Sequence, residues 1–245
     1  MNPQTLEEAR QLFTSVKPIE NVLTVICPPF VYLEELAKLQ NDKIILGAQD
    51  VFWEESGAFT GEISIKQLSE FGVKYVLVGH SERRALGETD EMINKKLLVA
   101  LKQNIRPILL VGEKEKGESR EDVLIDQLSR DLAGVESPNL IICYEPVWAI
   151  SSHSPILRQG FGGQGRSNAD TPESALEAIS SVREILVKMF SEEISKNIPI
   201  LYGGSANAGN IREFLKHEEI AGAVVGSASL KPEEFNKILE ITSSL

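Results

Sequence analysis

The sequence contains little cysteine and no long hydrophobic run. Its only two cysteines, Cys27 and Cys143, lie inside apolar segments, and neither belongs to a C-x-x-C pair. This spacing argues against a redox or zinc site and favours reduced thiols in the core. No segment approaches the ~18 unbroken apolar residues of a membrane span, and the first residues lack the basic start and apolar centre of a secretory signal. We therefore expect a cytoplasmic protein that does not enter a membrane.

Positive charge is also scarce. The 245 residues include 25 Lys plus Arg against 36 Asp plus Glu, which gives a formal net charge of −11. This charge repels phosphate backbones and anionic lipid surfaces, so nucleic acid and membranes are poor candidate partners. An anionic substrate would need a local pocket rich in N–H groups. The content of 42% hydrophobic and 25% charged residues is that of an ordinary globular chain, and we expect one domain over residues 1–245.

Short apolar runs rich in β-branched residues alternate with segments of helical period. Buried parallel strands have this composition, and the alternation predicts a parallel sheet covered by helices, an α/β fold. Seven strands are expected, at residues 22–27, 43–48, 74–79, 106–112, 140–144, 198–202 and 221–226.

The beginning of the chain departs from this alternation. The helical segment from Thr5 to Val16 has no strand before it, so eight helices accompany seven strands. A closed barrel needs one more strand, because a gap would leave unpaired backbone groups on the two strands beside it. The pattern therefore predicts a (β/α)8-type barrel whose first strand is missing from this chain. The gap is expected between the strands at 22–27 and 221–226.

Polar residues gather where the expected strands end. In parallel α/β folds this edge holds the active site, and a barrel brings all the strand ends into one ring. His80 follows the strand at 74–79 and precedes a segment that could open a helix, whose N-terminal end disfavours an imidazolium. A neutral imidazole can donate a hydrogen bond to a carbonyl oxygen. The alternative is that His80 merely caps the end of a strand.

Glu145 ends the apolar run at 140–144, an unfavourable place for a carboxylate without a purpose. Burial there would raise its proton affinity and suit a general base. The alternative is a structural glutamate that pairs with Arg83 or Arg84.

Two glycine turns follow the last two expected strands, Gly203-Gly204-Ser205 and Gly226-Ser227. Without side chains in the way, backbone N–H groups can approach an oxyanion closely, so a phosphate would fit there. In barrels, the loops after the last two strands commonly build such a site.

Four motifs together resemble the triosephosphate isomerase family. They are VGHSERR at 78–84, YEPVWA at 144–149, YGGS at 202–205 and GSASL at 226–230, in the order and spacing of that family. The segment GAQDVFWEESGAFTGE at 47–62 is similar to the family's third loop, which inserts into the neighbouring subunit of a homodimer. The resemblance covers essentially the whole chain.

The resemblance implies a TIM barrel that interconverts dihydroxyacetone phosphate and glyceraldehyde 3-phosphate through an enediol, in glycolysis and gluconeogenesis, without a metal or cofactor. It also implies the roles this family is known for, with Glu145 as the base and His80 as the electrophile. The remaining implied site residues are supporting Glu82 and Ser81, phosphate-binding Gly204, Ser205, Gly226 and Ser227, and the lid hinge Pro146, Val147 and Trp148. The implied partners are the triose phosphate and a second copy, bound through the loop around Thr60.

Three departures from the family leave a second function open. The chain begins at Met1-Asn2, as if cut just after the lysine of the family's Asn-x-Lys-Met-Asn pattern, so this cation is absent. The lid region carries an insertion at about 152–167, rich in Gly, Gln and Ser, which we expect to be flexible. Ser227 stands where the family usually has a second glycine. The alternative to a working isomerase is a catalytically impaired barrel homologue that binds phosphate ligands or only assembles, and we expect slow turnover by this chain.

Overall fold

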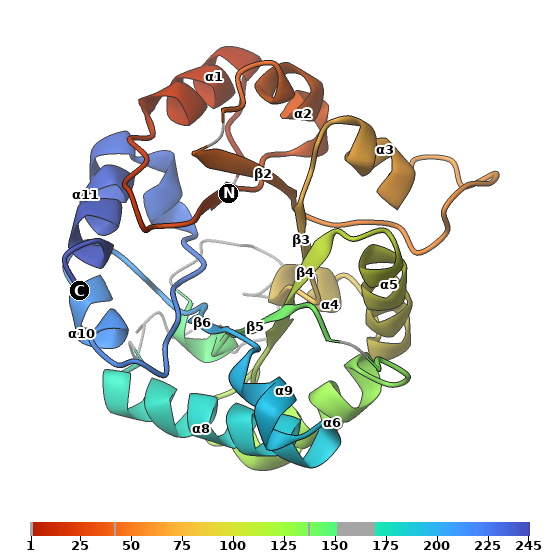
Figure 1. The fold of residues 1–245 in the computed structure, drawn as a ribbon, viewed down its shortest axis with the longest axis vertical. Coiled ribbons are helices and arrows are strands. Elements are labelled where there is room, and N and C mark those ends of the chain that lie inside the picture. The colour runs from red at the N-terminus through yellow and green to blue at the C-terminus, as the bar shows by residue number, and fades with distance from the viewer. Residues whose placement is uncertain (1, 42, 137, 151–169) are drawn as a thin grey trace.

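Parallel strands form the centre of the molecule and helices surround them. The computed structural model describes residues 2–41, 43–136, 138–150 and 170–245. Figure 1 shows the strands curling around the middle of a ring whose outer wall is helical. Six strands pair in the order of the sequence, each parallel to the next, which confirms the expected barrel-type sheet.

Each strand lies within one of the apolar runs that predict it. The strands are β1 (Thr24–Ile26), β2 (Ile44–Ala48), β3 (Tyr75–Val78), β4 (Arg106–Val111), β5 (Ile141–Tyr144) and β6 (Ile200–Tyr202). The seventh predicted strand, at 221–226, is reduced to one parallel bridge between Ala223 and Tyr202. Its backbone still follows β6, because the amide of Ala221 donates to Ile200 and the amide of Val224 donates to Tyr202.

Helices occupy the segments between these strands. They are α1 (Leu6–Ser15), α2 (Phe30–Ala37), α3 (Ile65–Glu70), α4 (Ser81–Ala85), α5 (Asp90–Lys102), α6 (Arg120–Asp131), α8 (Pro172–Met189), α9 (Glu192–Lys196), α10 (Ile211–Leu215) and α11 (Pro232–Thr242). Several begin after a Ser or Thr whose side chain accepts the amide three residues on, as at Thr5, Thr89 and Thr171. Each capping residue fixes where its helix begins and therefore where the loop before that helix ends.

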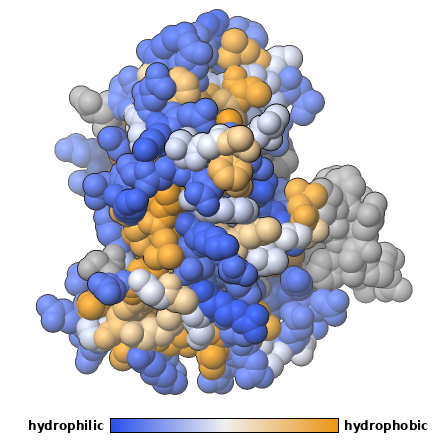
Figure 2. Space-filling model, turned by 90° about the vertical axis from the view of Figure 1, so that its right-hand side faces the viewer, coloured by the Kyte–Doolittle hydropathy of each residue, from blue (hydrophilic) through white to orange (hydrophobic). Residues whose placement is uncertain are grey.

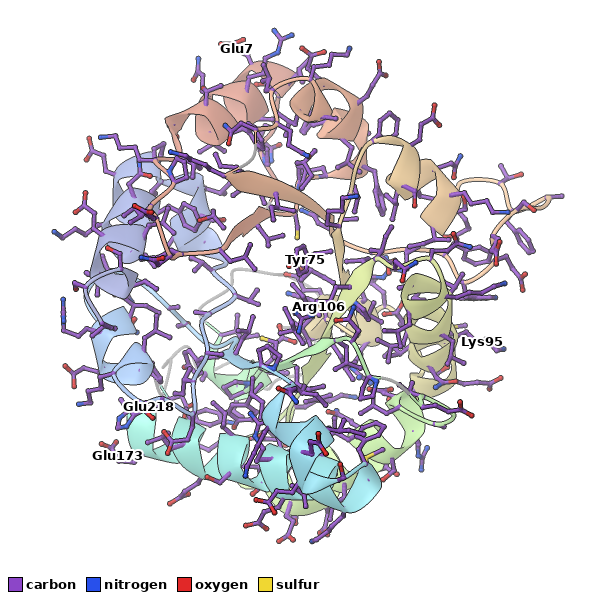
Figure 3. The ribbon with its side chains drawn as sticks, viewed as in Figure 1. Glu7, Tyr75, Lys95, Arg106, Glu173 and Glu218 are labelled. Atoms are coloured by element: carbon purple, nitrogen blue, oxygen red, sulfur yellow. The ribbon has the colours of Figure 1, made fainter. Side chains whose placement is uncertain are left out.

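Successive residues of a strand face two different apolar clusters. On β4, Leu109 and Val111 belong to the large core between the sheet and the helices. Ile108 and Leu110 join a second cluster with Tyr75, which Figure 3 labels near the centre of the ring. The alternation follows from the period of two along a strand, and it explains why the strands are apolar on both faces. Figure 3 also shows the labelled charged residues of the outer helices projecting away from the ring.

The sheet is open at β1. Within the described ranges, β1 pairs with β2 only, so its other edge has no strand partner. The opening therefore lies between β1 and the segment at 221–226, where the strand count predicts it. Outside the opening the helices still meet, because the Asn236 side chain accepts from the amide of Lys17 at 2.8 Å and donates to the carbonyl of Ser15 at 2.9 Å.

Two other expectations concern segments of the chain. None of the helices in the described part of the chain is long and apolar enough to cross a membrane. The predicted insertion at about 152–167 lies outside the described residues.

Candidate active site

His80 lies directly after β3 and caps the helix that follows. Gly79, between the strand and the histidine, has a φ of +78°, which glycine adopts without a steric penalty. The amide of Glu82 donates to Nδ1 of His80 at 3.2 Å, so the imidazole is the N-cap of α4. A ring nitrogen that accepts from an amide carries no proton, and this bond therefore assigns the ring proton to Nε2. One side chain can therefore cap α4 through Nδ1 and still present Nε2–H as a donor.

Glu145 follows β5, and its carboxylate lies against His80 and Ser81. Its Oε1 is 3.3 Å from Nε2 of His80, and its Oε2 accepts from the amide of Ser81 at 2.9 Å. The residue is only 3% exposed. Burial raises the pKa of the Glu145 carboxyl, while His80 and the Ser81 amide act in the opposite direction. A buried carboxylate of raised pKa beside an imidazole N–H is the composition of a general acid–base site.

The interpretation of Glu145 as the partner of an arginine is wrong. Arg83 lies 2.8 Å from a carboxylate oxygen of Asp50 and also contacts Glu88. Arg84 contacts Asp90 and Asp131. Because carboxylates from other elements already neutralise both arginines, neither cation is bonded to Glu145. Of the predicted supporting residues, Ser81 and Glu82 act here through their backbone amides, and the Glu82 carboxylate adds to the raised pKa of Glu145.

The residues after Glu145 form a short, tightly bonded turn. Val147–Ala149 make the 3-10 helix η1, which Pro146 precedes. The indole N–H of Trp148 donates to Oε1 of Glu113 at 3.0 Å, and the amide of Val147 donates to the carbonyl of Glu113 at 3.1 Å. The predicted hinge residues are therefore fastened to the loop that follows β4.

Glu113 is a residue of this region that the sequence analysis did not single out. It is 3% exposed, and its Oε1 also accepts from the Tyr144 hydroxyl at 2.8 Å and lies 3.3 Å from Nε of Arg120. Burial, and next the Glu113 carboxylate, raise the pKa of Tyr144, so its hydroxyl stays a donor. Its position in the sequence could have indicated Glu113, because it follows the apolar run at 106–112 just as Glu145 follows the run at 140–144.

The two predicted glycine turns lie on adjacent segments, which the parallel bridge between Tyr202 and Ala223 holds together. A Cβ on Gly204 would lie 2.2 Å from the Tyr202 hydroxyl, so a larger residue there would force the buried Tyr202 ring to move. The Ser205 hydroxyl donates to the carbonyl of Ala149 at 2.8 Å, which joins this turn to η1. On the neighbouring segment, exposed Gly226 and Ser227 lead into the 3-10 helix η2 (Ser227–Leu230).

The fold and the site together define an α/β-barrel protein with a carboxylate–imidazole pair at the carboxyl ends of β3 and β5. In the ranges that the structure describes, no group of three or more His, Cys, Asp or Glu side chains is arranged to hold a metal ion. A family model described as triosephosphate isomerase matches residues 1–242. The chain belongs to the triosephosphate isomerase family.

Relatives named triosephosphate isomerase are similar over nearly the whole chain. The protein of Carboxydothermus hydrogenoformans is 43% identical over 240 residues, which cover 94% of this chain and 90% of the relative. That of Aquifex aeolicus is 43% identical over 251 residues, 98% of this chain and 95% of the relative. That of Dictyoglomus thermophilum is 44% identical over 233 residues, 91% and 88% respectively. The likeness therefore extends well beyond the four motifs.

Proposed function

We propose that this protein is a triose-phosphate isomerase that interconverts dihydroxyacetone phosphate and glyceraldehyde 3-phosphate. The contact between Oε1 of Glu145 and Nε2 of His80, at 3.3 Å, carries the proposal, because the reaction needs a base and an N–H donor on one three-carbon substrate. Membership of the family supports the substrate. We place the reaction in glycolysis and gluconeogenesis in the cytoplasm, where the free thiols of Cys27 and Cys143 would stay reduced.

The proposed reaction moves one proton between two carbons and one between their oxygens, and it needs no cofactor. Glu145 takes a proton from the carbon beside the carbonyl, the C–H electron pair becomes a C=C bond, and the carbonyl oxygen gains negative charge. The Nε2–H of His80 donates to that oxygen, and the hydroxyl proton of the enediolate passes to it from the neighbouring oxygen. The C=C electron pair then takes the proton back from Glu145 at the former carbonyl carbon, while the oxygen that lost its proton forms the new C=O bond on the neighbouring carbon. Because Nε2–H now faces Glu145, a bound substrate oxygen would take over this contact. Pro146, Val147 and Trp148 would form the first hinge of a lid that excludes water.

A coupled assay of triose phosphate interconversion tests the function on the chain as it is. Turnover in both directions, unchanged by a metal chelator, is the expected result. Binding of a triose phosphate without turnover would instead identify a barrel homologue that has lost the reaction.

We also propose that Gly204, Ser205, Gly226 and Ser227 hold the substrate phosphate. A protein of net charge −11 needs a local source of N–H donors to attract an anion. The two turns supply backbone amides on adjacent segments, and side chains are small throughout. Ser205 contributes its backbone amide, since its hydroxyl donates to the carbonyl of Ala149, and the hydroxyl of Ser227 adds a further donor.

Replacing Ser227 by alanine is expected to raise the dissociation constant for inorganic phosphate about tenfold, because a hydroxyl hydrogen bond to an anion is lost. Titration calorimetry measures this constant. The control is Ser181→Ala on α8, where the hydroxyl donates only to the carbonyl of Glu177. Equal affinities in the two variants would contradict the phosphate assignment.

We propose, finally, a homodimer formed through the loop around Thr60. This loop, between β2 and α3, projects from the ring in Figure 1, and Phe59 within it is 43% exposed. In Figure 2 the side of the molecule that carries the loop faces the viewer and shows hydrophobic patches between hydrophilic residues. The Phe59 ring lies 4.8 Å from that of Phe52, so the exposed aromatic is anchored to the barrel.

Light scattering of the purified chain is expected to give the mass of two chains. Phe59→Asp would place a charge in the proposed contact and should give the mass of one chain. Val187→Asp on α8, at a comparably exposed apolar position, is the control and should leave the mass unchanged. A wild-type mass of one chain would contradict the proposal.

A further inference from the structure

Arg84 connects the strand ends that carry the site. From α4, its Nε donates to the carbonyl of Gly79 at 2.8 Å, and its Nη2 donates to the carbonyl of Leu110 at 3.4 Å. Gly79 immediately precedes His80, and Leu110 is the last residue but one of β4. One guanidinium therefore spans the carboxyl ends of β3 and β4.

This connection continues to Glu145, the proposed base. Val111, the residue after Leu110, accepts from the amide of Glu145 at 2.7 Å. Arg84 thus lies on a short chain of backbone bonds whose two ends are the peptides that carry His80 and Glu145. It makes this connection without a hydrogen bond to either side chain of the pair.

Two carboxylates hold Arg84 in this position. Its Nη1 donates to Asp90 at the start of α5, and its Nη2 donates to Oδ2 of Asp131 at 2.7 Å. The Arg84 side chain is 11% exposed and that of Asp131 is fully buried. Asn94 also fixes the end of α6, since its side-chain amide donates to the backbone carbonyl of Asp131 at 2.9 Å.

The buried carboxylate is not explained by stability alone. Burial raises the pKa of Asp131 to about 7, although Arg84 acts in the opposite direction. A carboxyl whose pKa is raised by folding makes the folded state less stable when it is ionised. Its second oxygen, Oδ1, is also buried and has no hydrogen-bond partner among the described residues. The buried Asp131 carboxylate, although unfavourable for stability, is better explained by its role in holding the Arg84 guanidinium in position.

We propose that Arg84 is a positioning residue for His80, held in place by Asp90 and Asp131. By fixing the carbonyl of Gly79 it fixes the peptide that leads into His80, and with it the direction in which Nε2–H points. The kinetic consequence rests on the proposed isomerase function. The competing interpretation is that Arg84 only links secondary structure.

Arg84→Ala is expected to lower kcat between about 10-fold and 100-fold while KM stays within about twofold, because a misdirected donor weakens the transition state more than substrate binding. The matched control is Arg183→Ala. Arg183 also donates to two backbone carbonyls, those of Ser195 and Ile198, but away from His80. We expect the control to keep kcat within about twofold of wild type, as remote substitutions usually do. Guanidinium ion at millimolar concentration should restore part of kcat in Arg84→Ala only.

Asp131→Asn tests the same idea without removing the guanidinium. Asparagine keeps the size and an acceptor oxygen but removes the charge, so kcat should fall less than in Arg84→Ala. Since Asp131 acts through Arg84, the double variant should be no slower than Arg84→Ala alone. If the two single losses of kcat instead multiply in the double variant, Asp131 and Arg84 act independently, and the proposal that Asp131 acts through Arg84 is overturned. If Arg84→Ala does not fold, Arg84→Lys and Asp131→Asn carry the test.

Nitrogen NMR of the His80 ring separates this proposal from the proposed function. The wild-type spectrum should show a protonated Nε2 and an accepting Nδ1, and both signals should move in Arg84→Ala but not in Arg183→Ala. If the wild type does not isomerise triose phosphates, the proposed function fails and the His80 signals alone decide the positioning role. Unchanged His80 signals, or a kcat loss no larger than in the control, would overturn it.

Discussion

Replacing Glu145 by glutamine is expected to lower kcat for triose phosphate isomerisation about a thousandfold while KM changes by less than about threefold. Glutamine keeps the size of the side chain and an acceptor for the Ser81 amide, but it cannot take a proton from carbon. The measurement is the coupled assay in both directions. Glu177→Gln, at a glutamate that is 78% exposed on α8, is the control and should retain full activity.

The same variant has an opposite expected effect on stability. Burial raises the pKa of Glu145, so the folded protein binds this proton more tightly than the unfolded chain does. At a pH above the raised pKa the carboxylate is ionised in both states and its full penalty lowers stability. The penalty shrinks as the pH falls through the raised pKa, and it vanishes below the ordinary value of 4.5.

Glu145→Gln should therefore unfold at a higher temperature than wild type at pH 8, and the difference should close toward pH 4. Circular dichroism recorded during heating measures the unfolding temperature of the variant and of the wild type at each pH. A variant that is less active and more stable cannot owe its lost activity to unfolding. Lower stability of the glutamine variant at pH 8 would contradict the burial argument.

Gly112→Ala is expected to destabilise the fold by about 3 kcal/mol, the upper part of the range for added atoms in a packed core. A Cβ at this position would lie 2.2 Å from the carbonyl oxygen of Glu145 and 2.7 Å from its carbonyl carbon. Backbone atoms cannot swing aside as a side chain can, so β4 and β5 would have to separate. Because that displaces the peptide of the base, kcat should also fall, by about 100-fold.

The control for Gly112 is Gly209→Ala. The nearest atom to a Cβ there is Oδ1 of Asn207 at 3.1 Å, the far end of a side chain that can turn away. Denaturant unfolding and the coupled assay on both variants separate the clash from the general effect of replacing glycine. Equal losses of stability and kcat in the two variants would show that glycine at position 112 is not needed for the close approach of β4 and β5.

The strand ends could be predicted from the sequence because residues buried on both faces of a sheet must be apolar. A charged or titratable residue at the end of such a run is then conspicuous, which is how His80 and Glu145 were found. The prediction of a seventh strand is too long: the run at 221–226 is apolar and hydrogen-bonded to β6, but among the described residues it forms a single parallel bridge, at Ala223. Apolar composition predicts burial, and it does not specify how many residues have strand geometry.

The ion pairs could not be predicted in the same way. Arg84 and Asp131 are 47 residues apart, and their contact depends on how α6 packs beside the strand ends. With 36 acidic residues in the chain, no pattern indicates which two would hold this arginine. Likewise Glu113 was missed because its partners, Tyr144 and Trp148, converge on it only in the folded barrel.

The turn after Glu145 contains an optical probe. The chain has two tryptophans, Trp53 and Trp148, so Trp53→Phe leaves a single emitter. The Trp148 indole donates to the Glu113 carboxylate, and Nζ of Lys116 lies 5.2 Å from its ring centroid. Charges this close shift the emission wavelength of an indole, and any movement of the turn away from the loop after β4 would change their distances. Fluorescence of the single-tryptophan protein would thus follow this turn during ligand binding, without an attached dye.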